Sequence, residues 1–186
     1  MIKDFLPPIA VRLLTGLLYG WSGNYSTWQE AQKKCPGYNS DIIFNKVKNA
    51  LLKVKNGEAV FERDSVLFDK VQYSFPLLSA LSQAALNSNL KLNVLDFGGS
   101  LGSAYFQNRN LFKHIEEFKW NIIEQEHFVT EGKKTFENNE LSFYYTIDEC
   151  LMNQKINVLL LGSVLQYIKK PYNLLDDLLS KKMEYI

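Results

Sequence analysis

Cysteine and histidine are scarce in this chain. Its 186 residues include 2 cysteines and 2 histidines. Cys35 and Cys150 lie far apart, form no C-x-x-C pair and have no histidine nearby at the spacing of metal ligands. The usual sequence patterns of structural zinc sites and disulfide scaffolds are therefore missing. We predict no metal site, and a cytoplasmic location in which both thiols stay reduced.

The chain also lacks an excess of charge of either sign. Its 21 lysines and arginines nearly balance 20 aspartates and glutamates, and the two signs are interspersed along the sequence. Nucleic acids and acidic membrane surfaces attract strongly basic proteins. We therefore predict that neither a nucleic acid nor an acidic membrane surface is a partner.

No hydrophobic run is long enough to cross a membrane. An apolar stretch covers residues 9–21, but Arg12 and Thr15 interrupt it, and a membrane span needs about 20 consecutive apolar residues. We predict no membrane span, and an amphipathic helix that docks on the domain. The composition, 46% hydrophobic and 13% aromatic, suffices for one core with a covering segment.

Three of the 10 glycines lie close together in one segment. Residues 90–106, L-K-L-N-V-L-D-F-G-G-S-L-G-S-A-Y-F, read as a buried strand, a turn with Gly98, Gly99 and Gly102, and the start of a helix. Glycine permits positive φ and lets a ligand approach the backbone, while the first turn of a helix offers unpaired N–H groups. We therefore predict a cofactor-binding loop. The alternative is a turn that only connects strand and helix.

An acid just before the glycines bears on which cofactor binds. Dinucleotide loops follow the pattern G-x-G-x-x-G, whereas this chain has D-x-G-G-x-x-G, with Asp96 at the end of the strand. A carboxylate repels a pyrophosphate and attracts the cationic amino acid end of S-adenosylmethionine. The segment V-L-D-F-G-G-S-L-G resembles the first motif of class I S-adenosylmethionine-dependent methyltransferases. Ser100 stands where their D-x-G-x-G-x-G pattern has a glycine, and it still offers a backbone N–H and a hydroxyl.

A second acid follows the next predicted strand. Residues 119–123 read as a short strand after a helical segment at 104–118, and Glu124 and Gln125 follow at its end. A carboxylate here suits the ribose hydroxyls of S-adenosylmethionine but equally suits NAD, so it supports the fold more than the choice of cofactor. The alternative is a solvated glutamate at a strand end. The predicted cofactor site comprises Asp96, Gly98, Gly99, Ser100, Gly102, Glu124 and Gln125.

Strand and helix patterns alternate after the loop, which is typical of an α/β fold with a parallel sheet. We expect a Rossmann-like, open, mainly parallel sheet of the class I methyltransferase type. The further elements expected are a helix over 126–136, a strand over 141–146, a helix from 148, a strand over 156–161 and a helix over 172–181. The segment 160–167 resembles the fourth methyltransferase motif, whose strand end faces the transferable methyl group, and it adds Ser163 to the predicted site.

The sheet is expected to stop early. Residues 183–186 look like the start of a fifth strand, beyond which class I methyltransferases continue through a terminal pair. We expect either a fragment or truncated product, or a sheet that another chain completes, because an unpaired edge is prone to association. An oligomer that completes the edge is one such arrangement.

The first 89 residues contain no glycine loop and read as a helical cap on a cofactor-binding domain at 90–186. A helix is expected at 41–55. A second helical stretch is expected at 66–86, with a break at Pro76 because proline disrupts helix interiors.

A charged cluster lies between these two helices. Its sequence is F-E-R-D-S, residues 61–65. One interpretation is a loop in which Asp64 or Ser65 caps a helix. The other is a lid that reaches over the cofactor and brings Arg63 and Asp64 to the mouth of its site.

Several motifs in combination resemble one family. The pattern W-x-G-x-Y-x-x-W-x-E-A, from Trp21, is followed by G-Y, F-E-R-D-S, L-D-F-G-G-S-L-G and W-x-x-x-E-Q. Together they are similar to a family of bacterial proteins classed as methyltransferases and often found among surface-polysaccharide genes. The resemblance implies S-adenosylmethionine as cofactor, a small-molecule or saccharide acceptor and a role in polysaccharide biosynthesis. Trp21 and Trp28 could equally form a hydrophobic minicore.

Methyl transfer needs no fixed catalytic set, because the sulfonium supplies the driving force and the protein aligns donor and acceptor. If the acceptor is a sugar hydroxyl, a general base helps, and the candidates are Glu62, Asp64 and His127. His127 otherwise reads as a surface or ribose-side residue at a helix start. Tyr105 and Gln107 could line the methionine end of the cofactor, or Tyr105 could only pack.

Two other classes of function stay open. An NAD-dependent sugar-modifying enzyme would fit the fold, although the G-x-G-x-x-G spacing and a Y-x-x-x-K pair are both missing. A non-catalytic binding protein with a degenerate methyltransferase fold would fit the serine in the loop. Titration with S-adenosylhomocysteine and with NAD separates the three classes.

Overall fold

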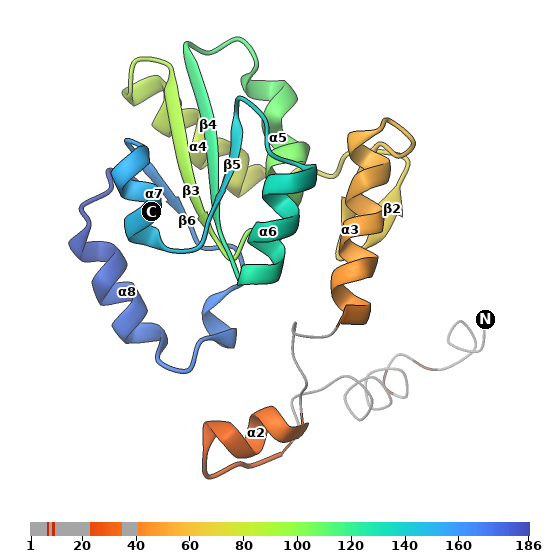
Figure 1. The fold of residues 1–186 in the computed structure, drawn as a ribbon. Helices are drawn as coiled ribbons and strands as arrows, with labels where there is room; N and C mark the ends of the chain where they lie inside the picture. Colours follow the sequence, from red (N-terminus) through yellow and green to blue (C-terminus); the bar gives the residue numbers. More distant parts are fainter. Residues whose placement is uncertain (1–6, 8, 10–22, 35–40) are drawn as a thin grey trace. The chain divides into compact units, whose positions relative to one another are not determined.

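A computed structural model describes residues 7, 9, 23–34 and 41–186 of the chain (Figure 1). The chain divides into two compact units, Met1–Tyr38 and Asn39–Ile186. In the first unit, helix α2 covers Trp28–Lys34. The predicted helix at 9–21 lies almost entirely outside the described residues, and so do Trp21 and Cys35.

The second unit is built around a four-stranded sheet. Its strands are β3 (Lys91–Phe97), β4 (Glu117–Ile123), β5 (Leu141–Tyr144) and β6 (Val158–Leu160), and their spatial order is β5-β4-β3-β6. All three pairings are parallel. The chain moves outward from β3 first on one side and then on the other, so the strand order reverses between β3 and β6. The expected open, mainly parallel α/β sheet is confirmed.

Helices connect successive strands, as in βαβ units. They are α5 (Ser103–Phe112), α6 (Glu126–Thr135), α7 (Ile147–Asn153) and, after the 3-10 turn η3 (Leu165–Tyr167), α8 (Pro171–Ser180). Each α-helix begins within one residue of the position predicted from the sequence. The helical segment predicted at 104–118 is wrong at its C-terminal end, because α5 stops at Phe112 and residues 117 and 118 belong to β4.

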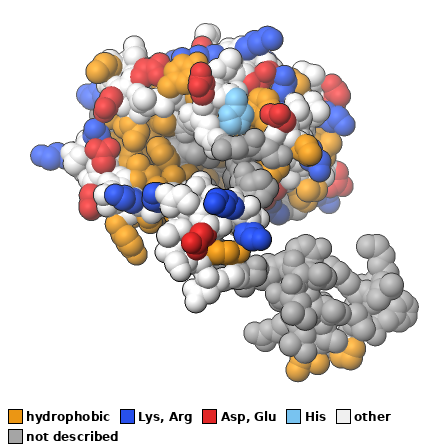
Figure 2. Space-filling model, turned by 60° about the horizontal axis from the view of Figure 1, so that its bottom comes forward, with side chains coloured by type: hydrophobic (Ala, Val, Ile, Leu, Met, Phe, Trp, Pro, Cys, Tyr) orange, Lys and Arg blue, Asp and Glu red, His pale blue; other side chains and the backbone are white. Residues whose placement is uncertain are grey.

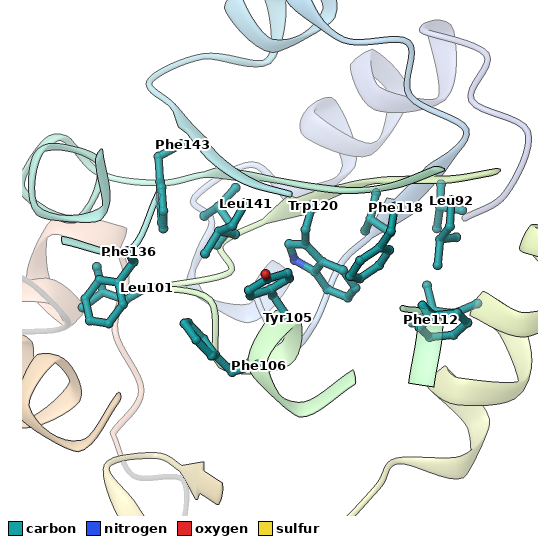
Figure 3. Packing of buried hydrophobic residues seen from close by; sticks show 14 of the residues in the cluster. Leu92, Leu101, Tyr105, Phe106, Phe112, Phe118, Trp120, Phe136, Leu141 and Phe143 are labelled. Atoms are coloured by element: carbon teal, nitrogen blue, oxygen red, sulfur yellow. The ribbon is translucent and has the colours of Figure 1, made fainter. Parts of the chain in front are cut away.

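The two faces of the sheet carry different cores. One face is rich in aromatic rings: Phe118 and Trp120 of β4 pack with Tyr105 and Phe106 of α5 (Figure 3). The ring centroids of Tyr105 and Phe118 lie 6.0 Å apart, and those of Phe118 and Trp120 lie 6.1 Å apart. The opposite face contributes a smaller cluster that contains Leu95, Ile123, Cys150, Leu159 and Leu178. Side chains alternate along a strand, so each strand contributes to the cores on both faces of the sheet. Helices cover both faces, as is usual for a parallel sheet.

Two helices and a hairpin precede the sheet within the second unit. Helix α3 (Asp41–Lys55) confirms the helix predicted there, and its Leu51 is buried in the aromatic core. Strands β1 (Phe61–Arg63) and β2 (Val66–Phe68) pair antiparallel. Helix α4 (Phe75–Asn87) follows and contacts β3.

The hairpin overturns expectations drawn from the sequence. The helix predicted from residue 66 is wrong, because residues 66–68 pair with β1 as a strand. Asp64 and Ser65 cap no helix; they form the hairpin turn, with φ of 51° and 67°. Pro76 breaks no helix either: it lies in the first turn of α4, where its missing N–H removes no helical hydrogen bond.

The predicted start of a further strand at 183–186 is present as a single parallel bridge. Tyr185 pairs with Val158 of β6. The Tyr185 N–H donates to the Asn157 carbonyl at 3.1 Å, and the Leu159 N–H donates to the Tyr185 carbonyl at 2.8 Å. The free side of β6 is thereby partly covered by the chain itself.

Candidate functional site

The glycine loop, residues 98–102, links the carboxyl end of β3 to the first turn of α5 (Figure 1). It is tied to the end of β4, because the Gly98 N–H donates to the Ile123 carbonyl at 2.9 Å. It also contacts the segment after β6 through Val164. In parallel sheets, ligands bind beyond the carboxyl ends of the strands, where the strand order reverses. The loop occupies that place.

Two glycines of the loop combine a positive φ with a side chain close to where a Cβ would lie. Gly98 has a φ of +79°, in the left-handed region, and a Cβ added to it would lie 2.5 Å from Cγ2 of Val164. Gly102 has a φ of +105°, and its Cβ would lie 3.3 Å from Cδ2 of Leu141. The sequence predicted that a ligand approaches the backbone closely here. At these two positions, side chains of the same chain, Val164 and Leu141, are what lies close to the backbone.

Asp96 lies beneath the loop. Its side chain is 2% exposed and accepts a hydrogen bond from Nε1 of Trp120 at 2.9 Å. A Cβ added to Gly99 would lie 2.5 Å from Oδ2 of Asp96, so this glycine rests directly on the carboxylate. Burial raises the pKa of Asp96 to about 7; the Trp120 hydrogen bond opposes the rise and the nearby Glu124 charge adds to it. The structure therefore gives Asp96 a supporting position under the loop, with little surface for direct contact with a ligand.

Glu124 is joined to the loop from the end of β4. Its carboxylate accepts hydrogen bonds from the N–H groups of Ser100 and Gln125, the second at 2.7 Å. Burial raises the pKa of Glu124, while these two hydrogen bonds and the nearby His127 oppose the rise. Ser100 itself has a φ of 54°, which is uncommon for a residue other than glycine. The sequence correctly placed Glu124 and Ser100 at one edge of the sheet.

The Gly99 N–H is the open donor of the loop that lies nearest the surface, since Leu101 is buried. In the part of the chain that the structure describes, the Gly99 N–H has no hydrogen-bond acceptor, and Gly99 is only half-buried. Ser163 lies close to this region: it is exposed, has a φ of 57° and directly precedes Val164, which contacts Gly98. The segments after β3, β4 and β6 thus all contribute to one edge.

Arg63 and Asp64 are held within the hairpin region. Arg63 donates to Oε1 of Gln72 at 3.1 Å, and its guanidinium lies 5.6 Å from the ring centroid of Phe68. Asp64 is exposed at the turn and lines a cavity of about 490 Å³ between α3 and the hairpin, together with Lys46. Arg63 is thus engaged by residues other than those of the glycine loop, and Asp64 lines a cavity whose lining includes no residue of that loop.

Glu62 reaches toward the loop instead. Its side chain is 2% exposed and accepts hydrogen bonds from the Ser103 hydroxyl and, at 3.1 Å, from the Ser65 N–H. Burial raises the pKa of Glu62, an effect that both hydrogen bonds oppose and the charge of Asp64 reinforces. Sequence reasoning named Glu62 only as a candidate base, and an acid followed by the charged Arg63 and Asp64 gave no signal of burial.

His127 lies in the first turn of α6, beside the N-cap residue Gln125, which is exposed. Its ring centroid is 5.2 Å from that of Phe44 and 4.7 Å from that of Phe128. With Phe44 and Glu126 it lines a cavity of about 440 Å³ between α3 and α6. The residue is therefore partly accessible, next to the end of β4 from which Glu124 projects.

Tyr105 and Gln107 have structural partners. The Tyr105 side chain is 1% exposed in the aromatic core, and its hydroxyl donates to Oε2 of Glu140 at 2.8 Å. Nε2 of Gln107 donates to the Gln72 carbonyl. Of the two interpretations of Tyr105, packing is the one that the structure supports.

The rest of the described surface, the helices and the cysteine offer little that points to another kind of site. On the face shown in Figure 2, acidic and basic side chains are interspersed with hydrophobic ones. Among the described residues, no helix is long and apolar enough to cross a membrane, and no group of histidine, cysteine and acidic side chains could hold a metal ion. Cys150 is a free, buried thiol whose pKa burial raises to about 12.

Comparison with known proteins gives no further guide: no family model matches the chain, and a search of curated proteins found no match. Its function is therefore inferred from its own residues.

Proposed function

We propose that the chain is an S-adenosylmethionine-dependent methyltransferase that acts on a small-molecule or saccharide acceptor. The observation that carries the proposal is the glycine loop at the reversal of the strand order, with the Asp96 carboxylate beneath it and the Glu124 carboxylate bonded to it. A cytoplasmic location and a role in surface polysaccharide synthesis belong to the same proposal.

The charge around the loop favours this cofactor over a dinucleotide. Residues 98–102 contain no lysine or arginine, and two carboxylates, of Asp96 and Glu124, lie against them. A pyrophosphate bound there would face the Glu124 carboxylate and, above about pH 7, the ionised Asp96 beneath the loop, without a compensating cation. A ligand with a sulfonium and an ammonium group is attracted instead, and the attraction is strong where water is scarce.

The residues present fit such a ligand. Glu124 can accept hydrogen bonds from ribose hydroxyls, and the open Gly99 N–H can donate to a polar ligand atom. Gln125 and Ser163, both exposed, flank the two sides of the loop. When bound, S-adenosylmethionine supplies a methyl group on a sulfonium, and the chain has to align the acceptor and exclude water.

The proposal also covers the general base that would activate the methyl acceptor. If the acceptor is a hydroxyl, His127 is the better placed of the two accessible candidate bases, because it lies in the first turn of α6, three residues after Glu124. Asp64 lies on the hairpin turn. Glu62 is withdrawn from solvent by Ser103 and Ser65.

Isothermal titration calorimetry tests the cofactor. We expect S-adenosylhomocysteine to bind and NAD not to bind. Binding of NAD alone would replace the proposal by a dinucleotide enzyme. If neither ligand binds to folded protein, the proposal is wrong and a non-catalytic protein with a degenerate fold is favoured. If S-adenosylhomocysteine binds, transfer of a labelled methyl group to sugar acceptors then distinguishes an enzyme from a binding protein.

A further inference from the structure

The hairpin β1–β2 contacts the helix that follows the glycine loop through one buried carboxylate. The side chain of Glu62 in β1 is 2% exposed. Its Oε1 accepts a hydrogen bond from the Ser103 hydroxyl, and its Oε2 accepts one from the Ser65 N–H at 3.1 Å. One side chain thus joins the hairpin turn to the first residue of α5.

Ser103 marks the point at which the loop becomes a helix. It follows Gly102, whose φ is +105° and whose N–H donates to the Gly99 carbonyl at 3.0 Å. A bond that holds Ser103 therefore also restricts the conformation of residues 98–102. Asp96 supports Gly99 from below and Glu124 holds Ser100 from the side. Glu62 in turn holds Ser103, the residue that directly follows the loop.

Docking of the hairpin does not require a charged residue at this position. Phe61 is 4% exposed, and its ring centroid lies 5.7 Å from that of Phe68 across the hairpin. The Gln107 side chain also donates to the Gln72 carbonyl, a second link between α5 and the hairpin segment. Burying a carboxylate is costly unless it is well hydrogen-bonded. In the described part of the chain, Glu62 forms no ion pair.

We propose that Glu62 is a positioning residue, which fixes the cofactor-binding conformation of the glycine loop through Ser103. What the loop binds rests on the function proposed above. The effect of Glu62 on the conformation of the loop does not depend on that function, so the positioning role and the proposed function can be tested separately.

Four single variants isolate this link. Glu62→Gln keeps the size of the side chain but replaces one accepting oxygen with a donating NH₂ group. Ser103→Ala removes only the hydroxyl, and Ser103→Thr restores one. Arg63→Ala is the matched control, because Arg63 lies next in β1 but contacts Gln72 and Phe68. Thermal unfolding of each variant establishes that it is folded.

The first measurement needs no ligand. In nitrogen-15 NMR spectra, we expect the amide signals of Gly98, Gly99 and Gly102 to shift in Glu62→Gln and Ser103→Ala. They should stay in place in Arg63→Ala and return toward the wild-type positions in Ser103→Thr. Unchanged loop signals in folded Ser103→Ala, or equal shifts in Arg63→Ala, would overturn the proposal, because Glu62 would then only stabilise the hairpin.

The second measurement is the affinity for S-adenosylhomocysteine. A hydrogen bond to a charged group is lost in Ser103→Ala, so we expect binding to weaken roughly tenfold, with Ser103→Thr close to wild type. Equal affinity in all variants, despite binding by the wild type, would also overturn the proposal. If the wild type binds no S-adenosylhomocysteine, the proposed function fails, and the NMR comparison alone decides the role of Glu62.

Discussion

The indole N–H of Trp120 donates to the carboxylate of Asp96 across two neighbouring parallel strands, at 2.9 Å. Trp120 in β4 is paired in register with Val94, two residues before Asp96 in β3, so the two side chains project from the same face of the sheet. Trp120 is 0% and Asp96 2% exposed. Asp96 is therefore shielded from water and accepts one hydrogen bond from the indole.

The protonation of Asp96 should make stability depend on pH. Burial raises its pKa from 3.8 to about 7, so the folded state holds the proton more tightly than the unfolded state. The stabilising contribution is complete below the unfolded pKa and is lost as the pH rises toward 7, a change of up to roughly 4 kcal/mol. Urea unfolding of the wild type from pH 4.5 to 7.5 should show this decline.

The variant Asp96→Asn isolates that contribution. An asparagine keeps an oxygen that can accept the Trp120 hydrogen bond but cannot ionise. We expect a flatter pH profile and, at pH 7.5, a variant more stable than the wild type. The raised pKa of Glu62 remains in both proteins and cancels in the comparison. Parallel profiles for the two proteins would contradict this account.

Glu124→Ala should weaken the binding of S-adenosylhomocysteine. The substitution removes the proposed acceptor of the ribose hydroxyls and also releases the Ser100 N–H that Glu124 binds. Each lost hydrogen bond to a charged acceptor is worth about 1.5–3 kcal/mol, so calorimetry should show a loss of roughly tenfold to a hundredfold or more. Glu116→Ala is the control, because Glu116 is exposed and lies just before the opposite end of β4. Unchanged affinity in folded Glu124→Ala would remove Glu124 from the site.

Much of this edge could be predicted from the sequence. The apolar run before Asp96, the glycines and the acid Glu124 after the next strand have local signals, and parallel strands bring their carboxyl ends to one edge. The hairpin had no such signal. Its strands have three residues each, too few to show alternation, and its turn uses Asp64 and Ser65 at positive φ where glycine or asparagine is the usual indicator.

Roles that depend on distant residues could not be predicted. Glu62 is buried because Ser103, 41 positions later, donates to it. Likewise, the sequence indicates that Gly98 matters, but its reason, the proximity of Val164 beyond β6, is a tertiary contact. Pattern analysis located the glycine loop and its neighbouring acids at one edge of the sheet, and it missed the tertiary contacts that support them.

Gly98→Ala can be compared with a glycine of nearly the same conformation. Gly57 has a φ of +77° with no atom within 4 Å of an added Cβ, whereas the added Cβ of Gly98 would meet Val164. Gly57→Ala should cost only the left-handed backbone, about 1–2 kcal/mol. Gly98→Ala should cost about 1–3 kcal/mol more for the overlap, and it should also weaken binding of S-adenosylhomocysteine.

Urea unfolding of both variants, and of Gly98→Ala combined with Val164→Ala, separates the two costs. The double variant should regain the part due to overlap and keep the part due to φ. If Gly98→Ala and Gly57→Ala are equally destabilised, the contact with Val164 is not what excludes a side chain at position 98.

Gly132→Ala should destabilise the protein although it improves helix propensity. Gly132 lies inside α6, where alanine is normally favoured by about 1 kcal/mol. Here, however, the added Cβ would lie 2.5 Å from Cδ1 of Phe143 in β5, so the helix could no longer pack as closely on the sheet. We expect a net loss of about 1–2 kcal/mol in urea unfolding. In a Phe143→Leu background the same glycine substitution should cost less, since the smaller side chain leaves room for the methyl group. A Gly132→Ala protein as stable as the wild type would mean that α6 shifts freely, and that its packing does not fix the position of Glu124, two residues before the helix.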